Sequence, residues 1–145
     1  MKLAALLPVF AILAACSTVN NRGPVATSDA PAAIGPYSQG IRAGNLFFVS
    51  GQIPLDPASG EVRAVTVEDQ TRRVMDNIGA ILAANGMSMA NVVSTTVYLR
   101  DLKDFTAMNG VYGSYFPVNA PARATVQVSR LPRDVAVEIS AVAAR

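Results

Sequence analysis

The chain has 145 residues, of which 51% are hydrophobic and 15% charged, and its formal net charge is +2 at pH 7. This length favours one domain with a proper core, and such sparse, nearly balanced charge argues against a nucleic-acid-binding surface, which needs clustered lysines and arginines. There is no histidine and one cysteine, which excludes an intrachain disulfide and a Cys/His zinc site and removes the commonest general base.

The first residues have the pattern of a bacterial export signal. A positive Met1-Lys2 precedes an apolar run over residues 3–15 that is too short to span a bilayer. The run ends in Leu13-Ala14-Ala15-Cys16, which resembles the lipobox of bacterial lipoproteins, in which the cysteine is lipidated and becomes the new N-terminus. We therefore predict a signal peptide over residues 1–15 and a lipid anchor on Cys16; an ordinary signal peptide and a buried helix are the alternatives.

Two further features complete this prediction for the N-terminal part of the chain. Ser17 follows the cysteine and resembles the sorting position of lipoproteins sent to the outer membrane, so we predict a cell-envelope protein on the periplasmic face of that membrane. The residues up to Ser28 are polar and interrupted by Gly23-Pro24, a composition typical of a tether. We therefore expect residues 16–28 to link the lipid to a domain over residues 29–145.

Strand-like and helix-like segments alternate along this domain. Ala43-Gly44 separates two strand-like runs and predicts a hairpin, and Thr66 has the position of a helix N-cap, with Asn85-Gly86 as the stop signal. The predicted strands are residues 38–42, 45–50, 92–99, 121–128 and 135–139. A second helix over residues 104–116 carries an apolar stripe of Phe105, Met108, Tyr112 and Tyr115. The order ββαβαββ predicts an α+β fold with one sheet covered by two helices.

The last two strands carry one charge each, Arg123 and Glu138, among mostly neutral residues. Because strand side chains alternate between faces, we assign one apolar set to the face under the helices: Ala124, Val126, Val128, Val135, Val137, Ile139 and Ala141. The opposite face then collects a semi-polar set: Arg123, Thr125, Gln127, Glu138, Ser140, Ser94, Thr96 and Tyr98. A sheet face washed by solvent usually carries more charge, so we expect other copies of the chain to cover this face in a closed oligomer; a monomer with an exposed, hydroxyl-rich face is the alternative.

Four motifs in the chain resemble those of the Rid (YjgF) family, and within it the RidA enamine/imine deaminases. They are the segment Ala30-Pro31-Ala32-Ala33-Ile34-Gly35-Pro36-Tyr37-Ser38-Gln39, then Ser50-Gly51-Gln52-Ile53-Pro54, then Pro121-Ala122-Arg123, and the ending from Leu131-Pro132 to Glu138-Ile139. The resemblance covers about residues 27–143. It implies a chorismate-mutase-like fold and a homotrimer whose mixed sheets form a central barrel, with sites at the subunit interfaces.

The resemblance also implies an activity. Members hydrolyse 2-enamino and 2-imino acids of the 2-aminoacrylate, 2-iminopropionate and 2-iminobutyrate type to 2-oxo acids and ammonia, without a metal or cofactor. It gives Arg123 the role of binding the substrate carboxylate, for which a planar guanidinium suits a bidentate contact. It gives Glu138 the role of orienting the attacking water. A structural salt bridge between these two residues is the alternative for both.

The family pattern names further substrate-binding positions. Tyr37 would close the pocket from a neighbouring subunit, and it could equally pack in an interface. Asn109 matches a site asparagine or is a solvent-facing helix residue, and Ser50 and Gly51 would let the backbone approach the ligand or simply end a strand. Thr125 departs from the cysteine of many RidA enzymes, but only its backbone carbonyl is expected to contact substrate.

Two alternatives to the enzyme remain: a protein that binds a 2-oxo acid or another small carboxylate without turnover, and a structural or chaperone-like trimer. The predicted lipoprotein leader weakens the transfer of function, because the enamines that RidA enzymes clear arise in the cytosol.

Overall fold

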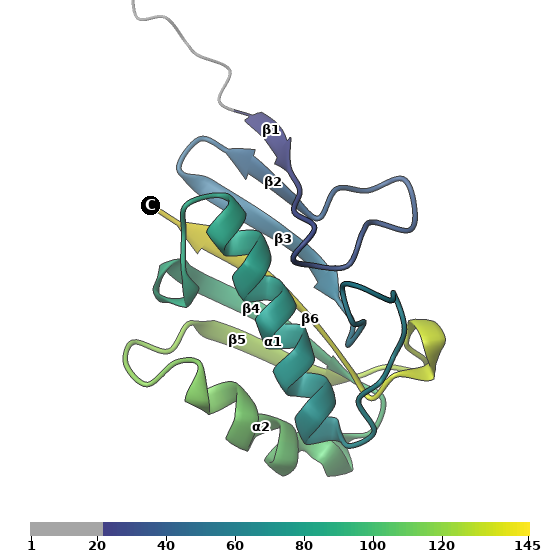
Figure 1. Ribbon diagram of the computed structural model, residues 1–145. Helices are drawn as coiled ribbons and strands as arrows, with labels where there is room; N and C mark the ends of the chain where they lie inside the picture. The colour runs from purple at the N-terminus through teal and green to yellow at the C-terminus, as the bar shows by residue number, and fades with distance from the viewer. Residues whose placement is uncertain (1–21) are drawn as a thin grey trace, which may run out of the picture.

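The computed structural model describes residues 22–145 and shows one mixed sheet with both helices packed on the same face (Figure 1). The strands are ordered β1-β2-β3-β6-β4-β5 across the sheet. The elements are β1 (Arg22–Val25), β2 (Gly40–Ala43), β3 (Leu46–Gln52), α1 (Val67–Ala84), β4 (Val92–Leu99), α2 (Phe105–Ser114), β5 (Ala122–Gln127) and β6 (Val137–Ala144), with single 3-10 turns at Met89–Asn91, Leu102–Asp104 and Pro132–Asp134. The predicted signal peptide and the Cys16 anchor lie outside the described residues.

All neighbouring strands are antiparallel except β4 and β5, which run parallel and are joined through α2. The predicted α+β architecture is therefore confirmed, with one strand more than expected. Arg22 to Val25 pair with β2, so this part of the predicted tether belongs to the sheet. Pro24 hid the strand from sequence reasoning, but an edge strand tolerates proline because one of its sides has no ladder partner.

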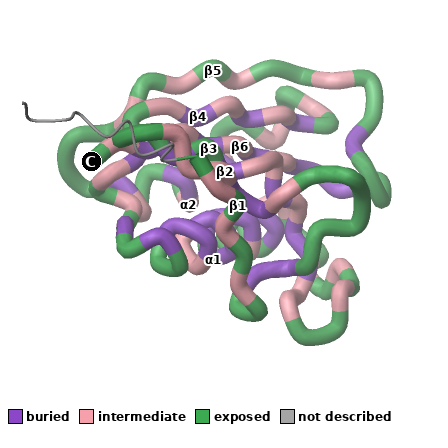
Figure 2. Tube along the Cα trace, turned by 90° about the horizontal axis from the view of Figure 1, so that it is seen from above, coloured by how far each residue is buried: buried purple, intermediate pink, exposed green. Residues whose placement is uncertain are grey.

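Helix α1 covers the middle of the sheet and carries the centre of the core. Its Val74, Ile78, Ile81 and Leu82 are at most 1% exposed, and Figure 2 shows buried stretches, in purple, along α1. The predicted helix start is confirmed, since the Thr66 hydroxyl accepts a hydrogen bond from the Asp69 amide at 3.1 Å. At the predicted stop Asn85 is the C-cap, and Gly86 adopts a φ of +65°, which glycine reaches without a Cβ penalty.

Helix α2 differs from its predicted apolar stripe. Met108 and Tyr112 are buried, but Phe105 is 38% exposed, and Phe116, just beyond the helix, is buried in its place. Phe116 packs against Tyr112 with ring centroids 4.9 Å apart. The exposed Phe105 ring is therefore available for another contact.

The face assignment of β6 is confirmed, but that of β5 is wrong. Val137, Ile139 and Ala141 are buried under the helices, as predicted. In β5, however, Arg123 lies beside Thr95, and Thr95 points to the helix side, where its hydroxyl bonds that of Tyr112 at 2.7 Å. Arg123, and with it Thr125 and Gln127 at alternate positions, therefore faces α2 rather than sharing a face with Glu138.

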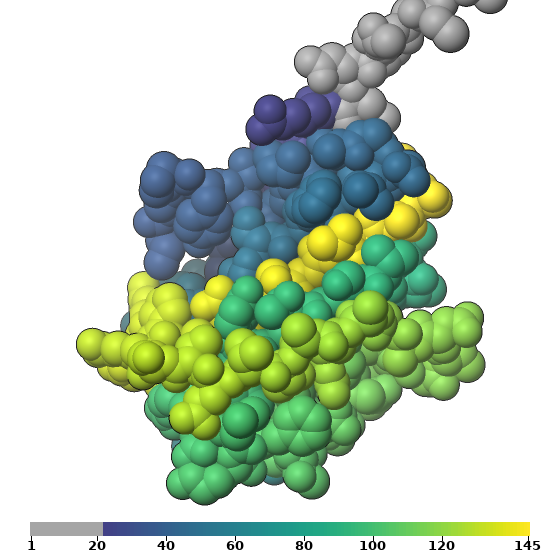
Figure 3. All heavy atoms as spheres, turned by 180° about the vertical axis from the view of Figure 1, so that it is seen from behind, coloured from purple at the N-terminus to yellow at the C-terminus, as the bar shows by residue number. Residues whose placement is uncertain are grey.

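The sheet face away from the helices is open. Figure 3 shows it with β3, β6, β4 and β5 side by side and neither helix across them. Phe48 and Val126 are 44% and 43% exposed on this face. The face is thus more apolar than predicted, because β5 turns its valine and not its arginine toward it.

Candidate functional site

A cavity of about 380 Å³ lies where the open sheet face meets the loop before β2. It is lined by Ile34, Tyr37, Ser50, Gly51, Ile53, Pro132 and Glu138. Four of the predicted site residues, Tyr37, Ser50, Gly51 and Glu138, are therefore brought together. Glu138 supplies the only ionisable carboxylate of this cavity, and its walls are otherwise mostly apolar.

Glu138 is held against Gly51 on the neighbouring strand. A Cβ added to Gly51 would overlap Oε1 of Glu138 and lie 3.0 Å from its Cδ. Ser50 and Gly51 lie in a register shift between β3 and β6, and such a bulge re-aims the strand. Glycine at position 51 is thus required for the observed position of the carboxylate, a closer constraint than the backbone approach inferred from sequence.

The surroundings of Glu138 raise the affinity of its carboxylate for a proton. The side chain is half-buried, and this burial raises the pKa of the Glu138 carboxyl above its usual value. Within residues 22–145 no lysine or arginine lies within 4.0 Å of it. A carboxylate with a raised pKa and no fixed cation is suited to exchanging protons with a ligand.

The loop that carries Tyr37 is fixed by a buried glutamine that sequence reasoning missed. The Gln39 side chain is 4% exposed; its amide nitrogen donates to the carbonyls of Ala30 and Pro31 at 3.2 and 2.7 Å, and its oxygen accepts from the Thr27 amide. Ser50 adds a hydroxyl bond to the Ser38 carbonyl at 2.6 Å. These bonds hold Tyr37 at the mouth of the cavity, where its ring is 48% exposed.

A second cluster forms around Arg123 on the helix side of the sheet. The guanidinium carbon lies 4.6 Å from the ring centroid of Tyr112 and 5.7 Å from that of Phe105. Within the described residues no carboxylate lies within 4.0 Å of Arg123. The guanidinium therefore rests on two aromatic rings and has no anionic partner in that part of the chain.

The remaining predicted residues are Thr125, which shares the face of β5 with Arg123, and Asn109 on α2. Thr125, two residues along β5, has a buried hydroxyl with no partner among the described residues. Asn109 is exposed on α2, one turn after Phe105, and neighbours three or four apart share a helix side. The aromatic support for Arg123 was missed from sequence, because the spacing of Phe105 and Tyr112 indicated only a core stripe.

The two clusters lie on opposite sides of the sheet. Glu138 pairs with Tyr98 of β4, whereas Arg123 pairs with Thr95 on the other side of that strand. Three residues along a strand span about 10 Å, and the sheet itself separates the two side chains. The Arg123–Glu138 salt bridge left open by the sequence is therefore not formed within one chain, and each cluster is one half of the predicted site.

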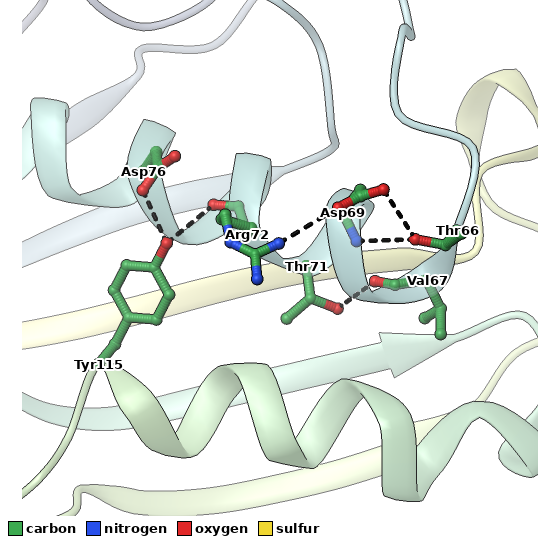
Figure 4. Close-up of polar contacts among 7 residues, drawn as sticks. All are labelled: Thr66, Val67, Asp69, Thr71, Arg72, Asp76 and Tyr115. Carbon is green, nitrogen blue, oxygen red and sulfur yellow. Dashed lines mark hydrogen bonds and ion pairs between the residues drawn. The ribbon is translucent and has the colours of Figure 1, made fainter.

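Another cavity, of about 410 Å³, lies beside the N-terminal half of α1 and contains none of the predicted residues. Several of its charged groups are satisfied internally. Arg72 pairs with Asp69 at 3.2 Å, and Asp76 accepts a hydrogen bond from Tyr115 at 2.7 Å (Figure 4). The Tyr115–Asp76 bond joins α1 to the chain that follows α2. Across residues 22–145 there is also no cluster of three or more histidine, cysteine, aspartate or glutamate residues that could hold a metal ion.

Comparison with known proteins agrees with the motif resemblance. Residues 27–145 match the family model described as Endoribonuclease L-PSP. The chain belongs to this family, which is the Rid (YjgF) family. It is 48% identical over 124 residues to the 2-iminobutanoate/2-iminopropanoate deaminase of Escherichia coli, covering 83% of this chain and 96% of that one. It is 46% identical over 136 residues to Reactive Intermediate Deaminase A, chloroplastic, of Arabidopsis thaliana, covering 94% and 73%.

Two solved structures share this fold over 85% of the chain. The YjgF gene product of E. coli superposes with a TM-score of 0.81 at 47% identity, over 85% of this chain and 98% of that one. E. coli TdcF, solved with bound serine, gives 0.81 at 44% identity over the same share of each chain. The chorismate-mutase-like α+β fold is thus confirmed. The resemblance to RidA-type deaminases is also supported at the level of the family.

Proposed function

We propose that this Rid protein hydrolyses 2-imino acids and their 2-enamino tautomers to 2-oxo acids and ammonia, at sites each built from two copies of the chain. The observation that carries the proposal is the division of the site. Among the described residues Arg123 has no carboxylate partner, Glu138 has no cation partner, and the two lie on opposite sides of the sheet. A substrate with a carboxylate and an adjacent iminium would use both halves.

The chemistry of the two halves suits this substrate class. Arg123 offers planar N–H donors for bidentate carboxylate binding, and its ring contacts use none of those donors. Glu138 lies in a cavity of about 380 Å³ with largely apolar walls, which fits the small alkyl group of such an acid. The 2-iminobutanoate/2-iminopropanoate deaminase of E. coli acts on this class by its name.

The proposed reaction needs one water and no redox partner. Glu138 in its ionised form takes a proton from water, and the oxygen of that water bonds to C2 of the iminium. The π electrons of the C=N bond pass to the nitrogen. The acid form of Glu138 then returns the proton to that nitrogen. The C–N bond then breaks and ammonia leaves, while Glu138, ionised again, takes the proton of the C2 hydroxyl, which becomes the carbonyl of the 2-oxo acid. An enamine enters after a proton is added at C3.

The same division supports a closed oligomer. An interface that brings the Arg123 side of one copy against the Glu138 side of the next is heterologous, and such interfaces form a ring when the rotation between copies closes. Three copies would give the homotrimer implied by the family resemblance. Its central barrel would then cover the open face, on which Phe48 and Val126 are 44% and 43% exposed.

A small-carboxylate-binding protein without turnover is the second candidate. It is favoured by the E. coli relative TdcF, whose structure was solved with bound serine, and by relatives named only as RutC family proteins, such as that of Pyrococcus horikoshii at 55% identity over 117 residues. The same Arg123 half-site would hold either ligand. A measurement of turnover distinguishes the deaminase from the small-carboxylate-binding protein.

We further propose that the chain is anchored in the cell envelope by lipid on Cys16, from the lipobox-like end of its apolar leader. The part of the chain that the structure describes has no helix both long and apolar enough to cross a membrane. Replacing Cys16 by serine in the full chain should move the protein from the membrane to the soluble fraction on cell fractionation. Unchanged membrane recovery would refute the anchor.

The central experiment compares wild type with Arg123→Ala on 2-iminopropanoate generated in situ. A charge-assisted contact contributes about 1.5–3 kcal/mol, so kcat/KM should fall at least about 10-fold. Arg72→Ala, which removes an exposed arginine on α1 away from both half-sites, is the matched control. No activity in wild type, or equal rates in wild type and Arg123→Ala, would refute the proposed enzymatic activity. Carboxylate binding without turnover would establish the second candidate.

A further inference from the structure

The guanidinium of Arg123 has an unusual support for a group that would meet a charged ligand. Its carbon lies over the rings of Tyr112 and Phe105, at 4.6 and 5.7 Å from their centroids. Both distances are within the range of cation–π attraction, which strengthens as the pair is desolvated. No carboxylate among residues 22–145 lies within 4.0 Å of Arg123. The aromatic rings, and not an ion pair, therefore orient this side chain.

The Tyr112 ring is itself held from two sides. Its hydroxyl and that of Thr95 on β4 lie 2.7 Å apart in a hydrogen bond, and Phe116 packs on the ring at 4.9 Å. Tyr112 is 4% exposed, and this burial raises the pKa of its phenol, so it stays neutral and keeps the negative π face toward Arg123. Phe105 is 38% exposed and extends the support toward solvent. The Tyr112 ring is thus anchored on a helix and a central strand before any ligand arrives.

We propose that Tyr112, extended by Phe105, is a positioning residue that holds the Arg123 guanidinium ready for the substrate carboxylate. Arginine side chains have large rotamer freedom, and a ligand must otherwise order the side chain when it binds. Stacking on the ring faces leaves the N–H donors at the guanidinium edge free for a bidentate contact. The inference rests on the proposed role of Arg123 as the carboxylate-binding group.

The test separates the ring from the hydroxyl. Tyr112→Leu removes the ring, Tyr112→Phe keeps the ring and removes the bond to Thr95, and Phe105→Leu removes the exposed ring. Tyr115→Leu is the matched control, because Tyr115 follows the same helix but bonds Asp76 and the Arg72 carbonyl instead. We expect Tyr112→Leu to raise KM for 2-iminopropanoate and Kd for pyruvate about 3- to 30-fold, the range of a cation–π contact, with kcat nearly unchanged. Tyr112→Phe and Tyr115→Leu should stay within about 2-fold of wild type, because both keep an aromatic ring at position 112 for the cation–π contact with Arg123.

An NMR measurement on the ligand-free protein tests the geometry without activity. A proton near an aromatic face is shifted upfield, so the Arg123 Nε–H signal should be ring-shifted in wild type and Tyr112→Phe and should move toward the ordinary arginine position in Tyr112→Leu. If Tyr112→Leu does not fold, Phe105→Leu carries the test, since Phe105 lies on the surface, and a smaller change of the same sign is expected. Unchanged KM, Kd and Arg123 signal in the folded ring-deletion variants would overturn the inference.

The two proposals fail in different ways. A ring-shifted Arg123 signal that Tyr112→Leu loses, in a wild type that neither turns over 2-iminopropanoate nor binds pyruvate, would overturn the proposed function while upholding the contact between Tyr112 and Arg123. Turnover that needs Arg123 but is insensitive to both ring deletions would keep the function and overturn the positioning role.

Discussion

At the scale of single residues, the proposed chemistry of this protein depends on two charges with unlike surroundings. Arg123 is supported by aromatic rings and has no anionic partner in the described chain. Glu138 is half-buried, and desolvation raises the pKa of its carboxyl. Neither residue compensates the other in one chain, although the sequence suggested that they could. Each is therefore left with unused capacity for a ligand.

Gly51 sets the position of Glu138, and this leads to a prediction. In Gly51→Ala the new methyl would overlap the carboxylate oxygen, so Glu138 must leave its position beside the strand. If Glu138 orients the attacking water, kcat should fall by about 100-fold, the lower end of the range attributed to positioned acid–base groups, while KM changes less, because Arg123 is untouched. Steady-state kinetics on 2-iminopropanoate provide the measurement.

Gly79→Ala is the matched control for this substitution, because a Cβ at that α1 glycine meets no heavy atom within 4 Å. It should leave kcat unchanged. A Gly51→Ala variant with wild-type kcat would show that the observed position of Glu138 is not needed for turnover.

At the scale of elements, local signals predicted most of the fold. The strand over residues 92–99 was predicted with the bounds that β4 has, because β-branched residues alternate throughout it. The Thr66 cap and the Asn85-Gly86 stop enclose α1 as expected. The missed element is β1, whose four residues have no strand composition and are ordered by pairing with β2.

The start of α1 supports a prediction about stability. Thr66 caps the helix through the Asp69 amide, and its hydroxyl also bonds the Asp69 carboxylate at 3.0 Å (Figure 4). Replacing Thr66 by alanine removes both bonds and should lower the free energy of unfolding by about 1 kcal/mol. Urea titration followed by circular dichroism measures this change. Thr66→Ser keeps the hydroxyl and should lie close to wild type; an equal loss in both variants would contradict the capping role.

At the scale of the whole molecule, the sheet separates the two clusters of predicted site residues, which lie on its opposite sides within one chain. Arg123 belongs to the α2 side and Glu138 to the open face. The proposed oligomer resolves this separation by placing unlike faces together. It also predicts that two variants, each inactive alone, regain activity when they assemble into the same oligomer.

The complementation prediction uses Arg123→Ala and Glu138→Gln, co-expressed or refolded as a 1:1 mixture. Each proposed site takes Arg123 from one copy and Glu138 from its neighbour, so random assembly leaves about a quarter of the sites with both wild-type groups. The mixture should therefore regain about a quarter of wild-type turnover, whereas each variant alone stays near background. Activity no greater than the sum of the two variants would show that both groups act within one copy.

The sequence by itself determined the family, which segments are helices or strands, and which residues are capable of binding or acid–base chemistry. These depend on local information: the motif glycines and prolines, the caps of α1, and the alternation along β4 and β6. The same local information was enough to name the residues of the proposed site, of which Tyr37, Ser50, Gly51 and Glu138 line one cavity, Arg123 and Thr125 face the opposite side of the sheet, and Asn109 lies on α2.

Only the tertiary structure decided how those residues are divided. Alternation separates the side chains of β5 into two sets but does not say which set faces the helices, and hydrophobicity favoured Val126 over Arg123. The parallel pairing of β5 with β4 places Arg123 on the side of the sheet that α2 covers. There its guanidinium contacts the rings of Tyr112 and Phe105. Val126 was left 43% exposed on the open face, and the single predicted site became two halves on opposite faces of one sheet.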